Sequence, residues 1–256
     1  MIEGKMATDS RPGERQYHLH VGPGEVGRYV LMPGDPARTD LIARRLDAPR
    51  LVAHNREFRT WTGTLKGEPV SVVSTGVGSP SAAIAVVELL RLGVHTLVRV
   101  GSCGALQKSV SDGDLIVVTG AVRDEGTTRQ YIPVEYPAVA HPQVIAALNA
   151  AASAAGGPRH IGIVYCKDAL TAAFPTEDVP LYDQLMQRTR AWIKAGVLAS
   201  EMESAAIFVL ASIAGARAGS ILQCIGPGSE SDETRFGRLI DVAVDGVARL
   251  MAGGPE

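Results

Sequence analysis

Residues 27–45, GRYVLMPGDPARTDLIARR, join an apolar run, a glycine turn and a helical pattern. The run Gly27–Leu31 is typical of a buried strand. Asp35 precedes Pro36, which is the usual arrangement of an N-cap residue followed by proline at the first helical position. The stretch therefore predicts a strand, a tight turn and a helix over Pro36–Arg45.

The same alternation continues along the chain. The other predicted strands are Pro69–Ser74, Thr96–Val100, Leu115–Thr119, His160–Tyr165 and Ser220–Ile225. The other predicted helices are Pro80–Leu92 with Ser79 as N-cap, Gln143–Ala155, Glu201–Ala214 after Ser200, and Arg235–Met251. Pro180–Ala195 is compatible with a helix, and the Gly, Pro and Ser content of Gly226–Thr234 predicts a loop. Strands that alternate with helices predict an α/β fold with a central mixed, mostly parallel sheet flanked by helices.

Length and composition indicate one globular domain. The chain has 256 residues, of which 46% are apolar and 20% charged, as in ordinary globular proteins. We expect residues 1–16, which are polar, to form a disordered tail and residues 17–256 to form a single domain.

Charge and cysteine content exclude several classes of protein. The formal net charge is −2 and no run of five basic residues occurs, so no nucleic-acid partner is expected. No apolar stretch reaches the roughly 18 residues typical of a membrane span, so no membrane partner is expected. The three scattered cysteines, Cys103, Cys166 and Cys224, form neither a disulfide framework nor a CxxC pair and favour a reducing, cytoplasmic location.

Two clusters suit an anion. Gly34 and Arg38 lie where a helix begins, and helix N-termini attract anions through free N–H groups and the helix dipole. The alternative is a capped helix with a surface arginine. Arg99 lies within an apolar strand and needs an anionic partner, and Gly101–Gly104 after it can offer N–H groups and a hydroxyl to a ligand. The alternative is a structural ion pair with a buried acid.

A third cluster is Ser200-Glu201-Met202-Glu203. On spacing alone, S-x-x-E favours a capping box in which Glu203 bonds back to the helix start. The functional alternative makes Glu203 a ligand for sugar hydroxyls, with Met202 packed on the sugar.

The remaining polar motifs are weaker. His54–Phe58 alone resembles a solvated loop, and His18-Leu19-His20 lacks a third ligand cluster, so no metal site is predicted. The chain has no GxSxG, HExxH or P-loop pattern.

Five stretches in order resemble the signature segments of the nucleoside phosphorylase family, especially uridine phosphorylase and the hexameric purine nucleoside phosphorylases. They are PGDPAR (33–38), HNREF (54–58), STGVGSPSAAIAVVEL (74–89), VRVGSCGAL (98–106) and SEMESAA (200–206). The resemblance runs from about Tyr17 to about Ala214, and it implies the nucleoside phosphorylase fold and phosphorolysis of a nucleoside, with uridine-like substrates favoured.

The resemblance also implies a role for each site residue. The phosphate ligands would be Gly34, Arg38, Arg99, Ser102 and, from a neighbouring subunit, Arg56. The ribose ligands would be Met202, Glu203 and the neighbour's His18. The base would lie near Tyr17, Cys103, Gly104 and Phe174. Arg99 and Glu203 would carry most of the catalysis.

The implied chemistry needs no cofactor or metal, only inorganic phosphate as co-substrate. Arginines would hold phosphate near C1′, where its charge would stabilise the cationic sugar of the transition state. Because two residues would cross between subunits, the resemblance implies at least a homodimer, and a trimer of dimers as the usual form.

The residues that would recognise the base differ from those of both branches of the family. Uridine phosphorylases carry Gln-x-Arg after an aromatic-Pro step, whereas Phe174-Pro175 is followed by Glu177 and Val179 at the closest positions. Purine phosphorylases carry an Asp after the last core strand, where this chain has Leu222-Gln223-Cys224-Ile225-Gly226. The uridine-type Arg that follows is missing as well. Asp232 or Glu230 are possible substitutes.

Three alternatives to a uridine-like phosphorylase follow. One is a purine nucleoside phosphorylase. Another is a hydrolytic nucleosidase, which the presence of Arg38, Arg56 and Arg99 argues against. The third is a nucleoside-binding protein with degenerate activity, which only the missing base readers support. The sequence determines neither the base, nor ribose against deoxyribose, nor salvage against biosynthesis.

Overall fold

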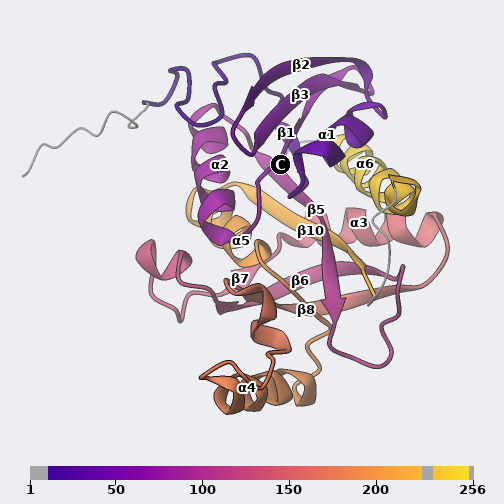
Figure 1. Ribbon diagram of the computed structural model, residues 1–256. Coiled ribbons are helices and arrows are strands. Elements are labelled where there is room, and N and C mark those ends of the chain that lie inside the picture. The colour runs from indigo at the N-terminus through magenta and orange to yellow at the C-terminus, as the bar shows by residue number, and fades with distance from the viewer. Residues whose placement is uncertain (1–10, 227–232, 254–256) are drawn as a thin grey trace, which may run out of the picture.

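The computed structural model describes residues 11–226 and 233–253. Strands and helices alternate through most of this part of the chain (Figure 1). The strands are β1 (Tyr29–Met32), β2 (Asp47–Asn55), β3 (Phe58–Leu65), β4 (Glu68–Val73), β5 (Thr96–Ala105), β6 (Leu115–Asp124), β7 (Ala138–Val139), β8 (Arg159–Lys167), β9 (Ala199–Glu201) and β10 (Arg217–Cys224). The α-helices are α1 (Pro36–Ala43), α2 (Ser79–Arg91), α3 (Pro142–Ala154), α4 (Tyr182–Lys194), α5 (Ser204–Ile213) and α6 (Gly237–Ala252).

One mixed sheet organises the described residues. Its order is β10-β6-β8-β9-β5-β1-β4-β3-β2, and β5 also pairs with β10, so that five strands close into a ring. The neighbours β4, β1, β5 and β10 are parallel to one another, while β2, β3 and β4 form an antiparallel meander. The mixed sheet expected from the sequence is confirmed, with its parallel strands at the centre.

Helices cover both faces of this sheet (Figure 1). Helices α2 and α5 pack together on one face, over a core that includes Leu89, Ile207 and Phe208. Helices α1, α3 and α6 cover the other face, over a core that includes Leu148 and Leu239. These two cores fix the central strands, and the strands in turn position the site described below.

The predicted helix at Pro36 begins as expected. The Asp35 side chain accepts a hydrogen bond from the Ala37 N–H at 2.9 Å, and proline occupies the first turn. The prediction for α2 was wrong at its start, because Gly78 is the N-cap and Ser79 is the first helical residue. Ser79 Oγ instead donates to the carbonyl of Met202 at 2.8 Å.

The expected disordered tail, residues 1–16, lies largely outside the described residues. Of its described part, Gln16 is buried, and Arg15 pairs with Glu25 at 2.7 Å. Ordered contacts therefore begin before Tyr17. In the described parts of the chain, no helix combines the length and the apolarity needed to cross a membrane.

Candidate active site

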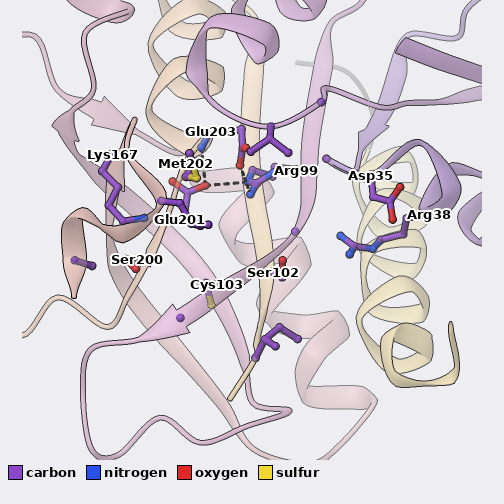
Figure 2. Close-up of a pocket in the computed structure, with 18 of the residues that line it drawn as sticks. Asp35, Arg38, Arg99, Ser102, Cys103, Lys167, Ser200, Glu201, Met202 and Glu203 are labelled. Atoms are coloured by element: carbon purple, nitrogen blue, oxygen red, sulfur yellow. Dashed lines mark hydrogen bonds and ion pairs between the residues drawn. The ribbon is translucent and has the colours of Figure 1, made fainter. Parts of the chain in front are cut away.

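A cavity of about 820 Å³ lies over the carboxyl ends of β1, β8 and β9 and the second half of β5. Figure 2 shows its charged side chains converging from these separate elements. Its polar and charged lining includes Asp35, Arg38, Glu57, Arg99, Ser102, Lys167, Thr171, Ser200, Glu201 and Glu203. Much of the rest of its wall is small or apolar and includes Gly34, Gly101, Cys103, Gly104, Leu170, Phe174, Met202 and Ile225.

Arg99 is the central charge of this cavity. Its side chain is buried; Nε donates to Glu201 Oε2 at 2.9 Å, and Nη2 pairs with Glu203 (Figure 2). Burial opposes the charge, but the carboxylates of Glu203 and Glu201 outweigh it and raise the pKa of Arg99. Nη1 is buried and has no partner among the described residues. A buried N–H group without a partner is costly, so this nitrogen is available to donate to an anionic ligand.

Glycine at position 101 makes room for that guanidinium. A Cβ built on Gly101 would lie 2.7 Å from Arg99 Cζ and 2.9 Å from Leu222. The guanidinium therefore folds back over its own strand only because residue 101 lacks a side chain.

Arg38 supplies a second cation to the same region. Its guanidinium stacks 4.0 Å from the centroid of the Phe236 ring, which fixes its direction. Burial, and then repulsion from Arg99, lowers the pKa of Arg38 against the attraction of Asp35. Two guanidiniums that repel each other across a cavity form a site that an anion would stabilise.

Glu203 faces the cavity and not its own helix. Its Oε1 accepts from the Gly78 N–H at 2.5 Å, and its other oxygen pairs with Arg99. The capping-box interpretation of Ser200–Glu203 is therefore wrong. The Glu201 carboxylate accepts from the N–H groups of Glu203 at 2.9 Å and Ser204 at 3.0 Å, so Glu201 caps α5, which begins at Ser204.

The structure brings together most of the residues singled out in the sequence. The predicted phosphate, ribose and base residues that line the cavity are Gly34, Arg38, Arg99, Ser102, Cys103, Gly104, Phe174, Met202 and Glu203. Cys103 and the other two cysteines are buried free thiols. Tyr17, His18 and Arg56 do not line the cavity of their own chain.

These three outlying residues lie near one another. His18 Nδ1 is 2.7 Å from Glu88 Oε1 on α2, and the Asn55 side chain donates to the His18 carbonyl at 2.7 Å. Arg56 is exposed at the turn between β2 and β3, where its φ is 54°. The N-terminal segment and the hairpin turn thus form one surface outside the cavity.

Two buried charges at the cavity were missed in the sequence, Glu201 and Lys167. Lys167 is the last residue of β8 and is 3% exposed. It follows the apolar run HIGIVYC, and the argument that singled out Arg99, a charge in an apolar strand, could have found it.

The segment after β8, where the sequence suggested that the base binds, lines the cavity with residues that are mostly different from those compared with the family. Leu170, Thr171, Ala173 and Phe174 line the cavity, whereas Glu177 is exposed and neither it nor Val179 lines it. Glu230 and Asp232 lie outside the described residues.

Comparison with known proteins identifies the family of the chain. Residues 28–249 match the family described as the phosphorylase superfamily. The chain is 46% identical to the uridine phosphorylase of Treponema pallidum, over 82% of each chain. It is 39% identical to the guanosine phosphorylase of Halorubrum lacusprofundi, over 93% of this chain and 95% of the relative.

A solved structure extends the likeness to the fold. The crystal structure of uridine phosphorylase from Vibrio fischeri superimposes with a TM-score of 0.82 at 30% identity, covering 95% of this chain and all of that one. Family profile, relatives and fold all point to the same family. The chain belongs to the phosphorylase superfamily.

Proposed function

We propose that this protein cleaves the N-glycosidic bond of a uridine-like nucleoside with inorganic phosphate, giving the free base and ribose 1-phosphate. The observation that carries the proposal is the buried, unpartnered Nη1 of Arg99, on a cavity that Arg38 also lines. The uridine phosphorylases among the relatives support the same reaction.

Phosphate would bind between the two guanidiniums. Arginine forks match phosphate oxygens and form charge-assisted hydrogen bonds. The first turn of α1, beside Gly34, adds the positive end of a helix dipole. An anion here would also relieve the repulsion between Arg38 and Arg99.

The ribose would lie next to the phosphate, against Glu203 and Met202. The Gly78 N–H and Arg99 hold the Glu203 carboxylate in place, so its oxygens are fixed as acceptors for sugar hydroxyls. Because Arg99 pairs with Glu203, one guanidinium would link the phosphate site to the ribose site. This linkage would orient the nucleophile toward C1′.

Bond cleavage would follow from this placement. A phosphate oxygen bonds to C1′ while the C1′–N bond breaks and its electron pair moves onto the base. The sugar becomes cationic in the transition state, and the phosphate charge stabilises it. No residue of the chain needs to form a covalent intermediate.

The active unit would be at least a dimer. Arg56, His18 and Tyr17 share one surface outside the cavity of their own chain. On a neighbouring subunit this surface would supply a third arginine to the phosphate, a histidine to the 5′-hydroxyl and a tyrosine near the base. A trimer of such dimers is the larger assembly that we propose.

A guanosine-like substrate is the second candidate, favoured by the 39% identity to a guanosine phosphorylase over nearly the whole chain. Uracil and guanine differ in size but both carry oxo groups. The cavity volume of about 820 Å³ accommodates either nucleoside.

Product analysis tests the function directly. Purified protein is incubated with uridine, thymidine, inosine, guanosine, adenosine and methylthioadenosine, each with and without phosphate, and the bases are separated by chromatography. Phosphate-dependent release of uracil is the expected result. Release that ignores phosphate would indicate a hydrolytic nucleosidase, and no release would indicate a binding protein.

A further inference from the structure

A second cavity, of about 770 Å³, lies at the amino ends of the central parallel strands, away from the active site at their carboxyl ends. Among the described residues that line it, four are basic, Arg28, His95, His141 and Arg217, and one is acidic, Glu68. The nucleoside and phosphate sites proposed above use none of these five residues. The excess of basic side chains indicates a site for an anion.

The fold brings three of the basic residues side by side. Arg28 and His95 immediately precede β1 and β5, and Arg217 is the first residue of β10. The His95 N–H donates to the Arg28 carbonyl at 3.0 Å, and the Arg217 N–H donates to the His95 carbonyl at 2.9 Å. Because β1, β5 and β10 are neighbouring parallel strands, their starts meet at one edge of the sheet and carry positive charge into one cavity.

Arg217 is a buried cation whose partners are neutral. It is 8% exposed; its Nε donates to the Thr96 hydroxyl at 3.1 Å and its Nη1 to Gln143 Oε1 at 2.8 Å. Within the described parts of the chain it forms no ion pair. Arg99, by contrast, has two carboxylate partners. A buried charge without a counter-ion is costly, so an anionic ligand would stabilise Arg217.

The charges around His95 point the same way. Burial, and then repulsion from Arg217, Arg28 and His141, lowers the pKa of His95. Glu68 is exposed and forms no ion pair with either arginine within the residues that the structure describes. An anion placed among these groups would relieve their mutual repulsion.

Helix α3 adds a backbone contribution to the same wall. Its N-cap is His141, and Gln143 lies in its first turn; both line the cavity. No side chain caps this helix start. The 13-residue helix therefore directs the positive end of its dipole and uncapped N–H groups toward the region where the basic side chains gather.

We propose that this second cavity binds a small phosphomonoester, with its phosphate among Arg28, His95 and Arg217. A phosphomonoester carries nearly two negative charges at pH 7, and arginine forks match its oxygens. The cavity volume leaves room beside the phosphate for a sugar or a nucleoside, and Tyr29 and Met251 provide less polar wall for it. Binding there does not depend on the reaction proposed above.

Isothermal titration calorimetry tests this with uridine 5′-monophosphate and ribose 5-phosphate, and with uridine and ribose as unphosphorylated controls. Because the active site also attracts anions, Arg217→Met is compared with Arg38→Met. We expect phosphomonoester binding that persists in Arg38→Met and weakens about tenfold or more in Arg217→Met. Arg190→Gln, which removes an exposed arginine outside both cavities, should bind as the wild type.

The two phosphorylated probes distinguish the sources of the phosphate group. Tighter binding of uridine 5′-monophosphate would identify a nucleotide as the ligand, and equal binding of both would identify a sugar phosphate. Uridine or ribose that binds as well as its phosphate ester would overturn the role of the phosphate.

A second variant covers the case in which Arg217→Met disturbs folding. Arg28 is exposed, and no ion pair within the described residues depends on it, so Arg28→Gln should keep the Tm of the wild type and weaken binding several-fold. Three results would overturn the proposal: no phosphate-dependent binding in the wild type, binding that is lost only in Arg38→Met, or unchanged binding in a folded Arg28→Gln.

Discussion

Arg99 is the residue on which the site depends most. Its guanidinium pairs with two buried carboxylates and leaves Nη1 for the phosphate that we propose as co-substrate. We expect Arg99→Ala to lower kcat/KM for phosphorolysis at least 10²-fold, about 3 kcal/mol, because a fixed donor to the phosphate is lost. Steady-state kinetics with varied phosphate tests this. Activity retained within about tenfold would contradict the phosphate assignment.

The same substitution also tests the electrostatics of the fold. Without Arg99, two buried glutamates lack their counter-ion, and such a loss typically costs about 3–5 kcal/mol. Thermal unfolding should therefore show a lower Tm for Arg99→Ala, and Arg38→Ala, which breaks no ion pair with these acids, should unfold close to the wild type.

Glu203 gives a prediction about pH. Burial raises the pKa of Glu203, with Glu201 adding to the effect and Arg99 opposing it. A raised pKa means that the carboxylate is protonated at a higher pH than an exposed glutamate, and the protonated form loses an acceptor for the ribose hydroxyls. Activity should therefore fall as the pH is lowered, beginning above the ordinary range of glutamate.

Glu203→Gln supplies the comparison for that pH profile. It should raise the KM of the nucleoside and lack the acidic limb, while its Tm stays near that of the wild type, because the Glu203 side chain makes no capping hydrogen bond to α5 and Arg99 keeps Glu201 as a partner. An unchanged acidic limb in Glu203→Gln would assign the titration to another group.

At the scale of elements, the sequence predicted the parallel strands β1, β4, β5 and β10 because each is a short apolar run bounded by turn residues. It missed β2 and β3, because β2 is an exposed edge strand without regular alternation and its turn uses Arg56 where Gly or Asn is usual. It placed the start of α5 three residues early, because Ser200–Glu203 has the spacing of a capping box, whereas β9 occupies 199–201.

The candidate site was also predicted only in part: the sequence located residues that lie in local patterns but not those that depend on long-range contacts. Gly34 and Arg38 lie at the start of α1, and Arg99 and Ser102 lie in β5, where they interrupt an apolar run, so local patterns located all four. The role of Glu201 depends on Arg99, 102 residues away in the chain, and no local pattern encodes such a contact. The family resemblance supplied roles for Arg56 and His18 that one chain cannot display.

Strand β5 carries a prediction of its own. A methyl group at position 101 would meet the Arg99 guanidinium at 2.7 Å, so Gly101→Ala should displace Arg99 and raise the KM of phosphate about tenfold or more. The control is Gly126→Ala, where the added Cβ meets its nearest neighbour, Asp168, at an ordinary 3.6 Å. A Gly101→Ala variant with normal phosphate KM would mean that the guanidinium of Arg99 does not hold phosphate.

At the scale of the whole molecule, the question is whether one chain contains a complete site. Arg38 lines the cavity of its own chain, and Arg56 does not. If Arg56 acts on a neighbour, Arg38→Ala and Arg56→Ala damage the same site from different subunits. Each variant alone should then be nearly inactive, since every site in it lacks one phosphate contact.

Mixing the two variants distinguishes a site that a neighbour's Arg56 completes from a site that is complete within one chain. After subunit exchange, about half of the dimers contain one chain of each kind, and a two-fold interface gives such a dimer one site with both defects and one intact site. Activity should therefore return to about one quarter of the wild type. Native mass spectrometry checks that hybrid dimers form. If they form and the mixture is no more active than its components, Arg56 does not complete a neighbour's site. The cavity of each chain would then have to bind phosphate with Arg38 and Arg99 alone.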